Sequence, residues 1–118
     1  MASMDLGELT RRVEYISAGY ADLHDVARTD EWLLLKLTEE VGELVQAHLN
    51  SSGQSRDRGL DNDSQRRATE DELADVVSMC LVYAHRQGID VEQAIERKWF
   101  RHEQHHRDRG FDPETSER

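Results

Sequence analysis

The chain has 118 residues, 36% of them hydrophobic and 34% charged, and its formal net charge at pH 7 is −10. This length fits one domain, and the modest apolar content favours a helical protein that completes its core by pairing with copies of itself. An acidic chain is a poor candidate for binding nucleic acid through phosphate neutralisation, so we expect no nucleic-acid partner. Because neither a membrane-spanning apolar run nor a signal peptide is evident, we expect no membrane partner and a cytoplasmic protein.

The first predicted element is a helix over about residues 6–24, because Pro and Gly are rare and apolar residues recur at helical spacing. Charged residues, Glu14 among them, take the other side of this helix. A polar connection follows, in which Thr29 or Asp30 is a suitable N-cap for the next helix. The apolar stripe comprises Leu6, Leu9, Val13, Ile16, Tyr20 and Leu23.

The second predicted helix covers about residues 31–50. Its apolar stripe faces a core and comprises Leu37, Val41, Leu44, Val45 and Leu49. Three carboxylates, Glu39, Glu40 and Glu43, lie beside this stripe, whereas carboxylates on the opposite, solvent face are more usual. Gly42 is unfavourable inside a helix by about 0.5–1 kcal/mol relative to Ala, which suggests that a neighbouring helix or a ligand approaches closely there.

A polar segment at about residues 51–67 is predicted to be a mobile loop, either a solvated linker or a cover that closes over a ligand. The third predicted helix follows at about residues 68–87, with Gly88 as its C′ residue. Its apolar stripe makes the single cysteine a buried small hydrophobe. The stripe comprises Leu73, Val76, Val77, Cys80, Leu81 and Ala84.

Two acidic residues of this helix have different explanations. Thr69 and Glu72 have capping-box spacing, so Glu72 has a structural alternative as a cap of its own helix. That alternative does not explain Asp75, a weak helix former that lies one turn further in and beside core positions.

A fourth predicted helix covers about residues 91–107, with Asp90 as its N-cap. Its polar end carries several histidines. We interpret them as ordinary exposed residues at a helix end in preference to a transition-metal site. The tail at residues 112–118 is predicted to be disordered, so residues 1–111 are expected to form a single all-α domain.

The acidic residues of the second and third helices are paired. Glu40 and Glu43 are three residues apart, and so are Glu72 and Asp75. Residues i and i+3 share one face of an α-helix about 4.5 Å apart along the axis, so two packed helices would aim four carboxylates into one small volume. Clustered anions repel and lose hydration unless a cation lies between them.

Hard oxygen ligands of this kind suit Mg²⁺ or Mn²⁺ better than Zn²⁺. A redox di-iron centre would need Glu-x-x-His on two helices, which these motifs lack. Mg²⁺ is usually completed by substrate phosphates and lowers the pKa of a bound water, which predicts a substrate with a di- or triphosphate that water attacks.

Further candidates surround the paired acids. Glu39 is a possible extra ligand or general base, so the predicted catalytic residues are Glu39, Glu40 and Glu43. Basic groups would hold the phosphates and a tryptophan would stack on a base, unless it belongs to the core. These predicted substrate contacts are Lys36, Trp32, Lys98 and Arg101, with Trp99 as an alternative to Trp32.

The segment from Lys36 to Leu44, followed after a polar gap by the segment from Glu72 to Val77, resembles the MazG-like nucleotide pyrophosphohydrolases of the all-α NTP pyrophosphatase superfamily. The resemblance covers about residues 32–101. The shared pattern is Glu-x-x-Glu, a variable spacer and Glu-x-x-Asp, and it falls here on Glu40, Glu43, Glu72 and Asp75.

The resemblance implies a four-helix bundle of the MazG type, assembled as a homodimer or homotetramer. It also implies a Mg²⁺-dependent cut between the α and β phosphates of a nucleoside triphosphate, giving a monophosphate and pyrophosphate, with Mn²⁺ as a possible substitute. Family members often carry Lys, Asn and Arg near the last helix; Lys98 fits the first, and no Asn follows it.

The leading hypothesis is therefore a (d)NTP pyrophosphohydrolase that cleans the nucleotide pool. One alternative is a phosphoribosyl-ATP pyrophosphohydrolase-like enzyme, which shares the carboxylate logic and differs in substrate. The other is a non-catalytic helical oligomerisation module, whose acids are solvated faces and caps and whose melting temperature does not respond to Mg²⁺.

Overall fold

The computed structural model describes residues 3–53 and 61–117, and every regular element in this part of the chain is helical. The predicted all-α class is confirmed. The chain divides into two compact units, Met1–Gly88 and Ile89–Arg118. Among the described residues, no helix has both the length and the apolar character needed to cross a membrane.

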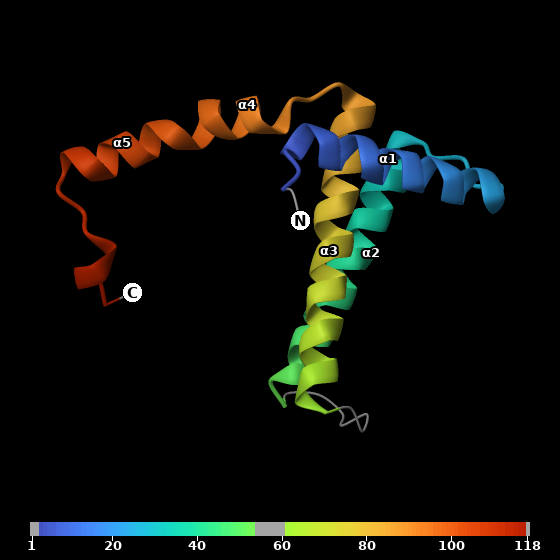
Figure 1. Ribbon diagram of the computed structural model, residues 1–118, viewed down its shortest axis with the longest axis horizontal. Helices are drawn as coiled ribbons and strands as arrows, with labels where there is room; N and C mark the ends of the chain where they lie inside the picture. Colours follow the sequence, from blue (N-terminus) through green and yellow to red (C-terminus); the bar gives the residue numbers. More distant parts are fainter. Residues whose placement is uncertain (1–2, 54–60, 118) are drawn as a thin grey trace. The chain divides into compact units, whose positions relative to one another are not determined.

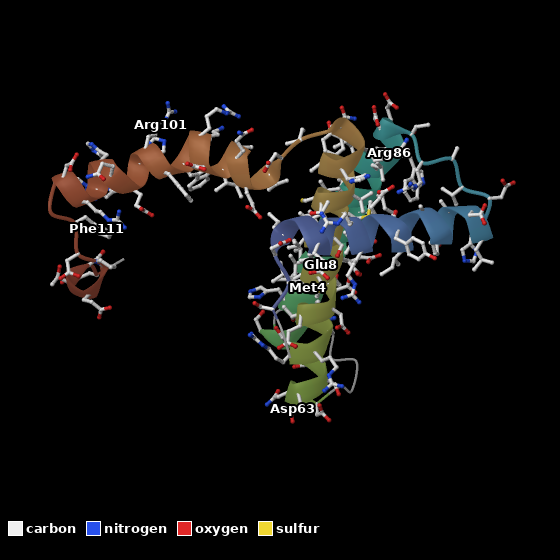
Figure 2. The ribbon with its side chains drawn as sticks, turned by 45° about the horizontal axis from the view of Figure 1, so that its top comes forward. Met4, Glu8, Asp63, Arg86, Arg101 and Phe111 are labelled. Carbon is white, nitrogen blue, oxygen red and sulfur yellow. The ribbon has the colours of Figure 1, made fainter. Side chains whose placement is uncertain are left out.

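The first unit contains α1 (Leu6–Leu23), α2 (Asp30–Ser51) and α3 (Asn62–Gln87). α2 and α3 lie side by side and run in opposite directions, and α1 crosses them near the end where α2 begins and α3 ends (Figure 1). Asp63 and Arg86 mark the two ends of α3 (Figure 2). The α2–α3 hairpin is the frame on which the paired acids are placed.

The starts of α1 and α2 follow the capping rule, in which a side-chain oxygen satisfies a free backbone N–H of the first turn. The side chain of Asp5 accepts a hydrogen bond from the N–H of Glu8. That of Thr29, one of the two predicted caps, accepts from the N–H of Trp32.

α3 begins earlier than the sequence pattern indicated. Its first residue is Asn62, because the side chain of Asp61 caps the helix by accepting from the N–H of Ser64. Residues 62–67, predicted as part of the loop, are therefore helical. Residues 54–60 of that predicted loop lie outside the described residues.

The core of the first unit is small. Leu33 of α2 and Val82 of α3 are its fully buried large side chains. The remaining buried hydrophobic residues are Ala21, Ala47, Leu81 and Ala84. Such a core buries little apolar area per residue, in keeping with the modest apolar content of the chain.

Several residues predicted to face a core are exposed, and those predictions are wrong for the single chain. In α2, Val41 is 42% exposed and Val45 is 51% exposed, although both belong to the stripe predicted to face a core. Cys80 of α3 is also exposed. Helical spacing identifies an apolar face, but the helices of this unit use only part of each such face for mutual packing.

Glu14, predicted to lie on the side of α1 away from the apolar stripe, is partly buried and forms an ion pair that the sequence did not indicate. Its carboxylate accepts two hydrogen bonds from the guanidinium of Arg28, at 2.8 and 3.0 Å. Both side chains are largely shielded from solvent, and the hydrogen bond from Arg28 lowers the pKa of Glu14. The guanidinium of Arg86 donates a hydrogen bond to the backbone carbonyl of Arg28 at 2.9 Å. This bond joins the segment between α1 and α2 to the end of α3.

The second unit contains α4 (Val91–Ile95), a π-helical segment η1 (Glu96–Phe100) and α5 (Arg101–Asp108). Asp90 is the N-cap of α4, as predicted. These elements together cover the predicted fourth helix; the π-helical segment was not foreseen. A short 3-10 turn, η2 (Pro113–Thr115), lies in the segment predicted to be a disordered tail.

Candidate metal centre

The structure brings the two predicted acid pairs together. Glu40 and Glu43 project from α2, and Glu72 and Asp75 project from α3. One carboxylate oxygen from each of the four residues can be chosen so that all four atoms lie within 4.8 Å of one another. The antiparallel pairing of α2 and α3 produces this arrangement, because it sets the middle turns of the two helices side by side.

The centre is partly enclosed. Glu40 is only 8% exposed and is the buried charged residue of the described chain, whereas Glu43 and Asp75 are open to solvent. Among the described residues, Glu40 Oε2 and Glu72 Oε2 are buried side-chain oxygens without a hydrogen-bond partner. A buried acceptor without a partner costs about 1–3 kcal/mol, and more when it is charged. A cation between the four carboxylates would satisfy both oxygens.

The pKa values of Glu40 and Glu72 are both raised, which also indicates that negative charge is unfavourable at this centre. Burial raises the pKa of Glu40, and its hydrogen bond with Glu43 and the charges of Glu43 and Asp75 raise it further, against the opposing effect of Lys36. Burial likewise raises the pKa of Glu72, reinforced by the charges of Glu43 and Asp75. Negative charge is thus disfavoured at this centre unless positive charge accompanies it.

Glu72 does not cap its own helix. Because α3 begins at Asn62, Thr69 lies well inside the helix, and its hydroxyl donates to the backbone carbonyl of Gln65. The capping-box alternative for Glu72 is therefore wrong. Its carboxylate belongs to the acidic cluster instead.

Lys36 is the basic residue that contacts the acids of this centre among the described residues. Its ammonium lies 3.4 Å from Glu39 Oε1 and 3.6 Å from Glu40 Oε1. Burial acts to lower the pKa of Lys36, but its hydrogen bond to Glu39 and the charges of Glu39 and Glu40 raise it overall. Glu39 itself is exposed and stands outside the group of four, so its part in metal binding or base catalysis stays a prediction.

The other predicted substrate contacts are not tested by this geometry. Trp32 is half-buried in the first turn of α2. Lys98 and Arg101 belong to the second unit and are exposed there. No described atom outside the local helix backbone lies within 4 Å of a Cβ placed on Gly42, so packing within the chain does not explain that glycine.

The structure also shows a cavity that the sequence pattern did not indicate. It has a volume of about 300 Å³ and opens beside the acidic cluster, with which it shares Glu43 and Glu72. Three residues with carboxamide side chains, from both helices, contribute to its other walls. The remaining lining residues are Gln46, Ala47, Asn50, Gln65 and Ala68.

Fold and site together define an all-α protein whose central helical hairpin carries a four-carboxylate centre that could hold a divalent cation. The sequence model of the MazG-like family matches residues 25–116, which contain both acid pairs. The chain belongs to the MazG-like family. Comparisons with curated proteins and with solved structures returned no match.

Proposed function

We propose that the protein is a Mg²⁺-dependent pyrophosphohydrolase that cleaves (d)NTPs between the α and β phosphates, releasing a nucleoside monophosphate and pyrophosphate. Membership of the MazG-like family suggests an NTP pyrophosphatase-type function. The observation that carries the proposal is the group of four converging carboxylates, two of which have buried oxygens without a hydrogen-bond partner among the described residues. Clearing unwanted nucleotides from the cellular pool, in the cytoplasm, is the role we assign to this activity.

The four carboxylates fit Mg²⁺ by their chemistry, since hard oxygen donors from protein and substrate phosphates are its usual ligands, and Mn²⁺ can replace it in such a set. A bound Mg²⁺ would neutralise phosphate oxygens and lower the pKa of a coordinated water. Glu40 and Glu72 would hold the ion from the enclosed side, and Glu43 and Asp75 from the side that faces solvent and substrate.

Neighbouring residues have complementary roles in this proposal. Lys36 would contact the phosphates, because its ammonium already lies beside Glu39 and Glu40 at the rim of the centre. The exposed carboxylate of Glu39 would accept a proton from the attacking water. Lys98 and Arg101 remain proposed contacts to the phosphates, and Trp32 remains a predicted substrate contact.

We further propose that the protein works as a homodimer or homotetramer. Exposed apolar residues follow both helices of the central hairpin: Leu34, Val41 and Val45 in α2, and Leu73 and Val77 in α3. These residues form what we call the apolar rows. A second copy presenting the same rows would bury them in a self-complementary interface, as expected for a chain with a small core of its own.

The alternatives receive less support. A helical oligomerisation module would leave its acids on solvated faces or at caps, but Glu40 is buried and Glu72 is not a cap. A phosphoribosyl-ATP pyrophosphohydrolase-like enzyme would use the same carboxylates, and no feature of the described residues favours its substrate.

The test is pyrophosphate release from a panel of NTPs, dNTPs and damaged nucleotides, with and without Mg²⁺. We expect metal-dependent release, and a loss of roughly hundredfold or more in Asp75→Asn and Glu43→Gln with the fold retained by circular dichroism. Glu70→Gln is the matched control, because Glu70 lies on the surface of α3 and pairs only with Arg66 in the described structure. Release at the native rate by both site variants would refute the assignment of the centre.

A further inference from the structure

The proposed function assigns no role to the cavity beside the acidic cluster, although the cavity and the cluster share residues. Glu43 and Glu72 line both, so a molecule held at the centre has direct access to the cavity. Along α2, Gln46 lies about 4.5 Å beyond Glu43 and Asn50 about 10 Å beyond it, at about 1.5 Å per residue. Lys36 lies on the other side of the cluster, about 10 Å before Glu43. The hairpin thus offers a cation at one side of the acids and the cavity at the other.

The described walls of the cavity, apolar surface with a few carboxamides, suit a neutral ligand with a polar edge better than a phosphate. Among the described residues, neither Lys nor Arg lines the cavity, whereas Gln46, Asn50 and Gln65 each bring a carboxamide with both donor and acceptor groups. The side-chain N–H of Gln46 donates to Asn50 Oδ1 at 3.1 Å, which ties two of these carboxamides together on α2. Ala47 and Ala68 keep the cavity open, and its volume of about 300 Å³ accommodates a heterocyclic base with part of a sugar.

We propose that Gln46, Asn50 and Gln65 form a nucleobase subsite, and that the enzyme selects its nucleotide by hydrogen bonds to the edge of the base. This inference rests on the proposed function and deepens it. The nucleotide lies along the hairpin with its base in the cavity, its α phosphate at the four carboxylates and its terminal phosphates toward Lys36. This placement puts the base beyond Glu43 and away from Trp32 in the first turn of α2, so it replaces the stacking role predicted for Trp32. Carboxamides pair with adjacent donor and acceptor groups on base edges, and a site built to make such bonds discriminates strongly against bases that cannot return them.

Two substitutions test the subsite from different directions. Gln65→Leu removes a carboxamide from the α3 wall at nearly constant volume, and Ala68→Leu fills the cavity without changing charge. Gln87→Leu is the matched control, because Gln87 ends the same helix and lies outside the cavity. The measurements are KM and kcat for each common NTP and dNTP, and inhibition by Mg²⁺–tripolyphosphate, a probe that has phosphates and no base.

We expect Gln65→Leu to raise KM for the preferred nucleotide about tenfold or more and to flatten the ranking among bases, with kcat within about twofold. Ala68→Leu should raise KM for every nucleotide. Inhibition by tripolyphosphate should remain unchanged in both variants, because that probe does not reach the cavity. A base ranking unchanged in Gln65→Leu, or an equal weakening of tripolyphosphate in both variants, would overturn the subsite.

This experiment separates the subsite from the proposed reaction. Calorimetric titration with a non-hydrolysable α,β-methylene nucleotide and Mg²⁺ measures binding without turnover. Base-dependent binding that Gln65→Leu weakens, with no pyrophosphate released from any nucleotide, would support the subsite and refute the hydrolase. Pyrophosphate release with identical base rankings in the wild type and Gln65→Leu would refute the subsite and support the hydrolase.

Discussion

Replacing Glu72 with Gln should make the metal-free protein more stable. Glu72 has a buried, unpartnered oxygen and shares a space of 4.8 Å with three other carboxylates. Two unit charges at this distance repel by about 3.5 kcal/mol at an effective dielectric constant of about 20. Solvent at the exposed Glu43 and Asp75, and the raised pKa values of Glu40 and Glu72, reduce the penalty. We therefore expect the free energy of unfolding to rise by about 1–2 kcal/mol, or the melting temperature by about 3–10 °C.

Mg²⁺ should reverse this order. An ion that binds only the folded state adds RT ln(1 + [L]/Kd), about 2.7 kcal/mol at a hundred times its Kd. The wild type gains this stabilisation in full, whereas Glu72→Gln has lost a ligand and gains much less. The assay is thermal or urea unfolding followed by circular dichroism, first in EDTA and then across a Mg²⁺ titration.

Glu70→Gln is the control for this comparison, because it makes the same change in net charge on the same helix. Glu70 is exposed and its ion pair with Arg66 spans 3.3 Å, so its loss should matter by only a few tenths of a kcal/mol and should not depend on Mg²⁺. Suppose that Glu72→Gln is no more stable than the control in EDTA and that Mg²⁺ leaves the wild type unchanged. The inference that repelling carboxylates await a cation would then be wrong.

Three further predictions concern pH, the Arg28 ion pair and association. The pKa values of Glu40 and Glu72 are raised in the folded state, so the folded protein binds more protons than the unfolded chain. The metal-free protein should therefore lose stability as pH rises from about 4.5 through those raised values. Calorimetry should show that Mg²⁺ binding weakens as pH falls through the same window. Arg28→Met should lower the free energy of unfolding by about 2 kcal/mol at neutral pH, as measured by urea unfolding. Because the pKa of Glu14 is lowered in the folded state, this loss of stability should be present above about pH 4.5 and vanish as pH falls through the lowered pKa. Cys80→Arg places a charge beside the apolar rows and should shift sedimentation toward the monomer, whereas an unchanged sedimentation coefficient would contradict association through that face.

The sequence predicted the acidic centre well because every step of that inference is local. A spacing of three residues fixes Glu40 with Glu43, and Glu72 with Asp75, on one face of each helix whatever the rest of the chain does. The only long-range requirement was that the two helices pack in a matching register, and the MazG-like pattern implied it. The cluster within 4.8 Å agrees with this prediction.

Features that depend on distant partners were missed. From the sequence, Glu14 is an ordinary polar residue of α1. Its hydrogen bonds with Arg28 join residues fourteen positions apart, so helical spacing cannot predict them. The start of α3 was placed too late, because Asp61 lies in a polar run where its capping role is one among many. The carboxamide cavity needs residues from two helices, and single Gln and Asn residues carry no pattern of their own.

On each helix of the hairpin, residues of the apolar rows lie about half a turn away from the exposed acid of the centre, as the numbering shows. Val41 and Val45 each lie two residues from Glu43, just as Leu73 and Val77 each lie two residues from Asp75. Two residues on an α-helix are separated by about 200°, so on both helices an apolar residue points away from the side where the exposed acid points. A second copy that covers the apolar rows would therefore leave Glu43 and Asp75 open to the metal and the substrate. In the proposed homo-oligomer, a substitution in the apolar rows would therefore leave Glu43 and Asp75 in place.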